Sequence, residues 1–289
     1  MSIFDYDFMS KVGVSSISAF VEVMGGQPLD RWKVNRQLSI KDRLSFTNLI
    51  RLGPKNWYAG LNTCLIYGCG FYFPAIYGLE NIWDKKYKKY KTNDKLDSID
   101  SIDSINSIDS INSIDYINSV NKCLFVSSII SIGVSWFEGV KTDQQVNKLR
   151  HKNLLQITKM RYRKYGMIGI IPSYYSTFAR EFCYCTGLLL LSPLIANRLE
   201  TGNQYANHFI GGGIAGIISQ TLSQPFDTIK TRQEKYKIPI HQAIRVIYKY
   251  EGVGAFWNGV LARCMRGMWS ISCMSLMQHY LRTYLDSKY

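Results

Sequence analysis

The sequence predicts an all-α membrane protein with six transmembrane helices, arranged as three pseudo-symmetric repeats of two helices. Three observations predict this fold class. The chain contains six long stretches with few charges, a charged signature ends every second stretch, and a basic connector follows each copy of the signature. Of the 289 residues, 46% are hydrophobic, so the chain can bury a substantial core.

The six stretches differ in how apolar they are. A transmembrane helix needs about 20 residues. The fourth stretch contains Arg180 and Glu181, and the sixth contains Arg263 and Arg266. Charges are tolerated inside a membrane where the helix faces a polar cavity, so we expect helices around a polar interior. The stretches cover residues 12–21, 56–79, 123–137, 165–197, 202–226 and 253–281.

The signature places a carboxylate and, three residues later, a lysine on one face of each odd-numbered helix. Taken singly, each pair is a surface ion pair worth under about 1 kcal/mol. Three pairs around a pseudo-threefold axis can instead form a ring, in which the carboxylate of one repeat meets the lysine of the next. The copies are Pro28-x-Asp30-x-x-Lys33, Trp136-x-Glu138-x-x-Lys141 and Pro225-x-Asp227-x-x-Lys230.

The first residue of the signature is expected to bend the helix. Pro28 and Pro225 each remove a backbone hydrogen bond and kink the helix axis. The second copy has Trp136 in this place, which we interpret either as an altered hinge with a bulkier side chain or as drift at a tolerant position.

A low-complexity segment separates the first two repeats. Residues 98–118 repeat the triplet Ser-Ile-Asp or Ser-Ile-Asn, with one Tyr. A three-residue period fits neither a helix nor a strand, so we expect a disordered loop insert. With the insert assigned to residues 91–121, the repeats are expected at 9–90, 122–200 and 201–289.

A second element recurs before the even-numbered stretches, in residues 53–60, 166–173 and 251–259, with glycines and, in two copies, aromatic residues. With these residues and the three signatures, the chain resembles the mitochondrial carrier family. The resemblance implies three repeats of two tilted helices, short amphipathic helices on the matrix side, and metabolite transport by alternating access across the mitochondrial inner membrane. It implies a matrix gate of Asp30, Lys33, Glu138, Lys141, Asp227 and Lys230, kinks at Pro28 and Pro225, and braces at Gln37 and Gln145; Glu234 takes the third brace position.

The resemblance also implies where a substrate binds. Its three contact points fall on Tyr67, Arg180 and Arg266, each taken with the next residue. Two arginines in one cavity favour a small anionic metabolite, through charge-assisted hydrogen bonds to carboxylate or phosphate. Alternatively, Arg180 and Glu181 form a structural ion pair, and Arg263 either widens the positive patch or pairs with a neighbour. The implied substrate-binding set is Tyr67, Gly68, Arg180, Glu181, Arg263, Arg266 and Gly267.

Two substrate classes stay open at this point. Some residues resemble the citrate/2-oxoglutarate branch of the family: Lys141-Thr142, residues 150–152, and the group Arg263, Gly267 and Trp269. This resemblance favours a di- or tricarboxylate as substrate. An acidic residue after the arginine of the second contact point, here Glu181, is typical of carriers for amino acids or their derivatives.

The resemblance also implies a second ion-pair network at the opposite end of the helices. The six positions of this network are Glu80 and Trp83, Pro193 and Ala196, and His279 and Arg282. Of these side chains, only Glu80 and Arg282 are charged at neutral pH. We therefore expect the matrix gate to be the stronger of the two.

The remaining features concern location and partners. Of the 35 Lys and Arg residues, 21 lie in the three connectors. This distribution explains the net charge of +14 without a nucleic-acid partner, and it predicts that the connectors lie in the matrix.

We expect no cofactor and no metal, because the seven cysteines and four histidines lack ligand or catalytic spacing. We expect that the acidic N-terminus is not a signal peptide and that any targeting signal is internal. A purely structural membrane protein would not need charges at related mid-helix positions. We expect a monomeric transporter in the inner membrane, not an enzyme, with cardiolipin at the matrix ends of the even helices.

Overall fold

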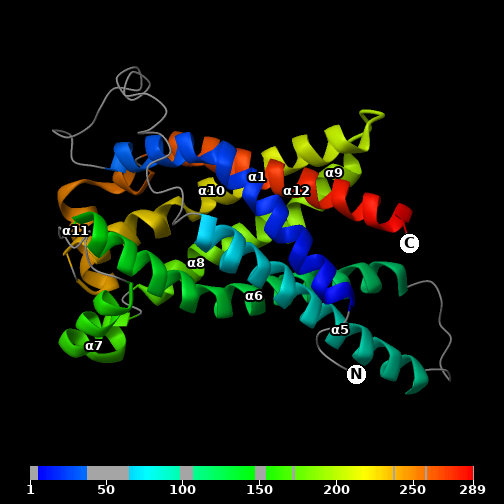
Figure 1. Cartoon of the computed structure of the whole chain (residues 1–289), viewed down its shortest axis with the longest axis horizontal. Coiled ribbons are helices and arrows are strands. Elements are labelled where there is room, and N and C mark those ends of the chain that lie inside the picture. Colours follow the sequence, from blue (N-terminus) through cyan, green and yellow to red (C-terminus); the bar gives the residue numbers. More distant parts are fainter. Residues whose placement is uncertain are drawn as a thin grey trace.

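A computed structural model describes residues 6–37, 65–97, 107–146, 154–170, 173–236, 238–257 and 259–288. Within these ranges the regular structure is entirely helical, in agreement with the all-α prediction. Long helices run side by side as a bundle, with α10 and α12 in close contact and α1 against α12 (Figure 1).

The N-terminal half of the chain contains three long helices. Helix α1 is Tyr6–Gln37 and contains Pro28. The chain is helical again from residue 65, passes through the π-helical turn η2 (Gly68–Tyr72) and continues as α5, Phe73–Asp97. Helix α6 spans Ser107–Val146.

The C-terminal half alternates long and short helices. Helix α7 is Leu154–Ile170, followed by α8 (Tyr174–Cys185), the π-helical turn η3 (Thr186–Leu191) and α9 (Ser192–Arg198). Helix α10, Gln204–Tyr236, contains Pro225. The short α11 (Ile240–Tyr250) and η4 (Val253–Trp257) precede α12, Val260–Lys288.

The two π-helical turns have a common cause. Each lies just before a proline inside a helix, Pro74 or Pro193, whose ring would clash with the carbonyl four residues earlier. In each turn a backbone N–H reaches five residues back instead, from Phe73 to Gly68 and from Ser192 to Gly187. The chain therefore passes these prolines without losing its helical course.

Two predicted boundaries need correction. The stretch 165–197 does not begin as a transmembrane helix, because Gly166 has a φ of 64° inside α7 and the long helix starts at Tyr174. Likewise, η4 and Gly259, with a φ of 83°, precede α12, so the stretch 253–281 begins about two helical turns too early. Both glycines have a positive φ, which glycine adopts at little steric cost.

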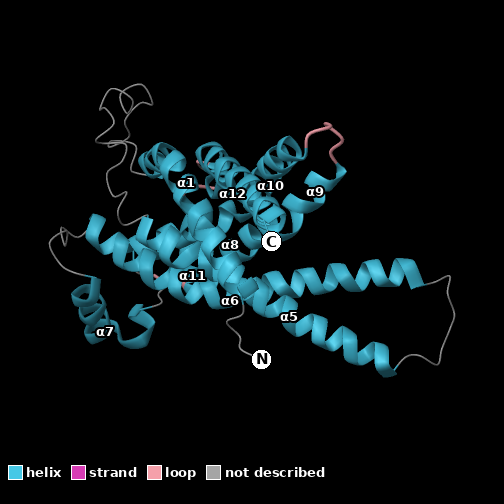
Figure 2. Cartoon of the chain, turned by 45° about the vertical axis from the view of Figure 1, so that its right-hand side comes forward, coloured by secondary structure: helices cyan, strands magenta, loops and turns pink. Residues whose placement is uncertain are grey.

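The predicted loop insert is also wrong in part. Residues 91–97 belong to α5 and residues 107–121 to α6, and Figure 2 shows these helix ends extending from the bundle as two arms. The triplet repeat contains no Gly or Pro that would stop a helix. Residues 98–106 lie outside the described ranges.

Two described stretches are long and apolar enough to cross a membrane, Tyr116–Val140 and Tyr174–Arg198, and a third, Val12–Gly26, is apolar but shorter. Helices α10 and α12 contain Gly, Ser, Gln and Arg on the faces that meet their neighbours, which lowers their hydropathy. The arrangement of six spans in three repeats therefore stays a prediction.

Glycines let α10 and α12 approach closely. A Cβ added at Gly212 would lie 2.8 Å from the carbonyl oxygen of Ile271, and one at Gly216 would lie 2.6 Å from that of Gly267. Backbone meets backbone at these points, so a side chain has no room. The main apolar core includes Phe73, Ile130, Leu188, Ala215, Ile271 and Met274, from five different elements.

Candidate functional site

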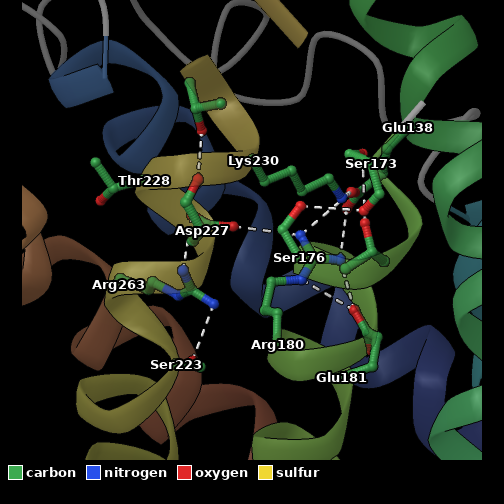
Figure 3. Close-up of polar contacts among 12 residues, drawn as sticks. Glu138, Ser173, Ser176, Arg180, Glu181, Ser223, Asp227, Thr228, Lys230 and Arg263 are labelled. Carbon is green, nitrogen blue, oxygen red and sulfur yellow. Dashed lines mark hydrogen bonds and ion pairs between the residues drawn. The ribbon is translucent and has the colours of Figure 1, made fainter. Parts of the chain in front are cut away.

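Arg180 of α8 is the centre of a buried charge cluster between α6, α8 and α10 (Figure 3). Its Nη1 and Nη2 donate to the two carboxylate oxygens of Glu138 at 3.2 and 3.1 Å. Its Nε donates to Oε1 of Glu181 at 3.0 Å, and Nη1 reaches Oδ1 of Asp227 at 3.3 Å. One guanidinium therefore contacts three carboxylates that come from three helices.

Arg263 of α12 completes the other side of Asp227. Its Nη1 lies 2.7 Å from Oδ2 of Asp227, its Nε donates to Oε1 of Gln220 at 2.7 Å, and its Nη2 donates to Oγ of Ser223 at 3.1 Å. Its side chain is almost fully buried. Of the two alternatives for Arg263, the structure therefore shows pairing with neighbours.

Lys230 of α10 contacts Glu138 of α6. This pair joins the carboxylate of the second repeat to the lysine of the third, which is the inter-repeat contact that the signature spacing predicts. Its role as part of a gate stays a prediction. The side chains of Asp30, Lys33 and Lys141 and of the braces Gln37 and Gln145 lie outside the described residues, although their backbones belong to α1 and α6.

The first contact point lies in an aromatic stack beside the cluster. The Tyr67 ring stacks on Phe137 at 4.5 Å and on Tyr72 at 5.4 Å between ring centres. The Tyr72 hydroxyl donates to Oε2 of Glu181 at 2.6 Å. Tyr67 is therefore connected to the charge cluster through Tyr72, a residue that the sequence analysis did not single out.

The two glycines of the predicted site are packing positions in this structure. A Cβ on Gly267 would lie 2.1 Å from Cγ of Gln220, and a Cβ on Gly68 would lie 3.0 Å from a methyl group of Val23. Both glycines therefore admit a neighbouring helix.

Arg266 lies about one turn after Arg263 on α12 and pairs with Glu22 of α1. The Glu22 side chain is fully buried. At the same interface between α1 and α12, the indole N–H of Trp269 donates to the backbone oxygen of Glu22 at 3.1 Å. A Cβ on Gly26 would lie 2.9 Å from the guanidinium carbon of Arg266, so the arginine packs against the glycine. Arg180 and Arg266 are thus held by different carboxylates.

Besides Tyr72, sequence reasoning missed Glu22 and Gln233. Glu22 follows an uncharged stretch directly, and a lone carboxylate within an apolar helix is a signal that could have revealed it. Gln233 of α10 is buried, and its Oε1 accepts from Oγ of Ser176 in α8 at 2.7 Å, one residue before the expected brace position at Glu234. No local pattern distinguishes Gln233 from an exposed glutamine.

In the cluster around Arg180 and in the neighbouring Glu22–Arg266 pair, four described cations contact four described carboxylates, so the arginines are already paired in this conformation. The cations are Arg180, Lys230, Arg263 and Arg266, and the carboxylates are Glu22, Glu138, Glu181 and Asp227.

The opposite end of the bundle has its own contacts. Lys122 of α6 lies 3.3 Å from Glu80 and 3.4 Å from Asp84, both in α5. The rings of His208 and His279 stack at 4.2 Å between α10 and α12. Within the described part of the chain, no group of three or more His, Cys, Asp or Glu side chains could hold a metal ion.

Trp136, in the proline slot of the second signature, contacts the next helix. Its indole N–H donates to Oγ1 of Thr158 in α7 at 3.0 Å. The tryptophan therefore links α6 to the connector helix that follows it.

Comparisons with known proteins agree with this architecture. A family model described as "Mitochondrial carrier protein" matches residues 201–289. The tricarboxylate transporter FUM11 of Gibberella moniliformis is 29% identical over 150 residues, which are 47% of this chain and 49% of that protein. The mitochondrial citrate transporter A of Aspergillus niger is 28% identical over 159 residues, 49% of this chain and 52% of that protein.

A third relative is the mitochondrial 2-oxodicarboxylate carrier 1 of Saccharomyces cerevisiae, 23% identical over 143 residues, 46% of each chain. The chain spans about half the length of the curated relatives it matches. The family match over residues 201–289, these relatives and the all-helical bundle all show similarity to the mitochondrial carrier family, whose members are multi-pass proteins of the mitochondrial inner membrane.

Proposed function

We propose that this chain is a transporter that carries small carboxylates, in exchange, across the mitochondrial inner membrane by alternating access. The observation that carries the proposal is the position of Arg180, buried within the bundle and in contact with three carboxylates from three helices. A guanidinium in such a place binds a carboxylate through two parallel hydrogen bonds. It can therefore exchange a protein carboxylate for one of the substrate. Transport, and not catalysis, is the activity of the family.

The proposed architecture has six spans in three repeats, 9–90, 122–200 and 201–289. Six long helical stretches in chain order support it: α1, residues 65–97, α6, residues 174–198, α10 and α12. The proposed matrix gate is the ring of signature residues, supported by the contact between Glu138 and Lys230. A monomer, with cardiolipin at the matrix ends of the even helices, belongs to the same proposal.

The substrate class is proposed to be di- or tricarboxylates such as citrate or 2-oxoglutarate. The names of the relatives support this class, since two are called tricarboxylate or citrate transporters and one a 2-oxodicarboxylate carrier. The two arginines of the contact points, Arg180 and Arg266, are its proposed ligands, with Tyr67 and Arg263 beside them.

The test is uptake of labelled substrate by the full chain in liposomes, against a panel of carboxylates, amino acids and nucleotides. We expect exchange of a di- or tricarboxylate, and its loss in Arg180→Met and Arg266→Met. Arg232, which pairs with Glu251 in an exposed position, provides the matched control Arg232→Met, which should keep the wild-type rate. Undiminished carboxylate uptake by both arginine variants of the cluster would contradict the proposed site.

An amino-acid carrier is the second candidate, and Glu181 favours it. Its carboxylate is buried beside Arg180, so the two side chains together could bind the carboxylate and the ammonium of one zwitterion. Glu181→Gln separates the candidates. Amino-acid transport should collapse because the ammonium loses its partner, whereas dicarboxylate transport should persist or rise because only a like charge is removed.

A further inference from the structure

Both carboxylate oxygens of Glu181 are occupied in this structure. Oε1 accepts from Nε of Arg180 at 3.0 Å and from Nη2 of the same guanidinium, and Oε2 accepts from the Tyr72 hydroxyl at 2.6 Å. The Glu181 side chain is only 3% exposed. A new hydrogen-bond donor therefore reaches this carboxylate only where Arg180 or Tyr72 gives up its place.

The partner at Oε2 is a neutral hydroxyl, unlike the cations that hold the other two carboxylates of the cluster. Lys230 contacts Glu138, and Arg263 contacts Asp227. An ammonium group that approached either of these carboxylates would compete with a cation, whereas at Oε2 of Glu181 it would compete with a neutral group. Glu181 is therefore the carboxylate that a substrate with an ammonium group would use, once the hydroxyl is absent.

The surroundings of Tyr72 fix the position of its hydroxyl. Tyr72 ends the π-helical turn η2, and its ring stacks on Tyr67 at 5.4 Å and packs edge-on against Phe73 at 5.0 Å. The ring of Tyr184 is a further neighbour at 6.0 Å. Rings at these separations and angles pack favourably, so the hydroxyl stays directed at Glu181.

The same arrangement orients the guanidinium of Arg180. Glu181 holds its Nε side, so the edge formed by Nη1 and Nη2 faces Glu138, which accepts from these two nitrogens at 3.2 and 3.1 Å. A substrate carboxylate bound at this edge in place of Glu138 would keep two parallel hydrogen bonds. Tyr72 therefore acts on Arg180 indirectly, through the carboxylate that orients it.

We propose that Tyr72 is a positioning residue that sets the substrate specificity: its hydroxyl holds Glu181 on Arg180 and so excludes substrates that carry an ammonium group beside the carboxylate. The inference rests on the proposed function and favours its first candidate, the carboxylate carrier, over the amino-acid carrier. It names 2-oxo acids, in preference to 2-amino acids of the same skeleton, as the substrate class.

The test compares two acids that differ in one substituent. 2-Oxoglutarate and L-glutamate share their carbon skeleton and both carboxylates, but one has a keto oxygen where the other has an ammonium group. Initial uptake of each labelled acid by the full chain in liposomes, at equal and subsaturating concentrations, gives a preference ratio. We expect the wild type to favour 2-oxoglutarate.

Tyr72→Phe keeps the ring and removes the hydroxyl. The preference ratio should fall about tenfold, because the ammonium group of L-glutamate can then bind the freed oxygen of Glu181. A merely structural role of Tyr72 would lower the uptake of both acids and leave the ratio unchanged.

Two further variants locate the effect. Tyr184→Phe is the matched control, because it removes a hydroxyl from the same group of rings, but one that pairs with Oγ of Ser270 at 3.0 Å and not with Glu181. It should keep the wild-type ratio. Tyr72→Phe combined with Glu181→Gln removes the charged acceptor itself, so the ratio should rise back toward that of the wild type.

The outcomes separate this inference from the proposed function. An unchanged ratio in Tyr72→Phe, or a ratio that stays low in the double variant, would overturn the role of Tyr72 and leave the carboxylate carrier standing. The same conclusion would follow from a wild type that takes up L-glutamate as readily as 2-oxoglutarate, or that takes up citrate but neither of these acids. Should the Tyr72 variants fail to fold, the wild-type preference decides. Absence of uptake of any carboxylate would instead defeat the proposed function.

Discussion

Replacing Arg180 by Met tests whether the charge cluster holds the helices together in the way the structure shows. The change removes the guanidinium from Glu138, Glu181 and Asp227 at once but keeps a side chain of similar length. Each of these carboxylates keeps one other partner, a lysine, a tyrosine or a second arginine. The variant therefore weakens three contacts without isolating any of the three carboxylates.

The expected magnitude follows from the burial of the partners. Removing one member of a buried ion pair costs about 3–5 kcal/mol, because it leaves a buried charge uncompensated. The retained partners place Arg180→Met near the lower end, at about 3 kcal/mol of the free energy of unfolding. Combining it with Glu181→Gln removes the most buried of the three charges. The free energy of unfolding lost in the double variant should therefore be smaller than the sum of the two single losses, by about 1 kcal/mol or more.

The assay is thermal unfolding of the full chain in detergent micelles. At about 2–4 °C per kcal/mol, Arg180→Met should lower the Tm by roughly 6–12 °C. Arg232→Met breaks an exposed pair with Glu251 and should cost under about 1 kcal/mol. A Tm of Arg180→Met equal to that of the control, or strictly additive effects in the double variant, would refute the reasoning.

Three further predictions concern contacts between helices. Cysteines at Glu138 and Lys230 should crosslink efficiently without substrate and less so with saturating substrate, as judged by gel mobility; a substrate-independent yield would argue against a gate. Gly216→Ala should destabilise the chain by about 1–3 kcal/mol, because the added Cβ would meet the backbone of α12. Gly13→Ala is the control: a Cβ added at Gly13 has no neighbour within 4 Å, so this variant should not be destabilised in the same melting experiment. Trp136→Phe should cost about 0.5–1.5 kcal/mol by loss of its hydrogen bond to α7, and an unchanged Tm would show that this bond contributes nothing.

The sequence by itself determined the features that depend on local pattern. Charge gaps and the three signatures predicted the all-α class, and they located the prolines inside α1 and α10. The same spacing predicted that a carboxylate of one repeat would meet a lysine of the next, as Glu138 and Lys230 do. These features are readable because helical geometry places residues three or four apart on one face, whatever the helix packs against.

Only the tertiary structure decided which carboxylates pair with Arg180 and Arg266. Glu22 and Arg266 are far apart in the chain, and no spacing rule connects them, yet the packing of α1 against α12 pairs them. The arginines that the sequence suggests as free for an anion are already compensated, by Glu22 and by the carboxylates around Arg180. The rotation of each helix about its axis and its shift along that axis determine which side chains meet across a helix interface. Both depend on close contacts between the helices, such as the one at Gly26, and therefore on more than either sequence segment alone.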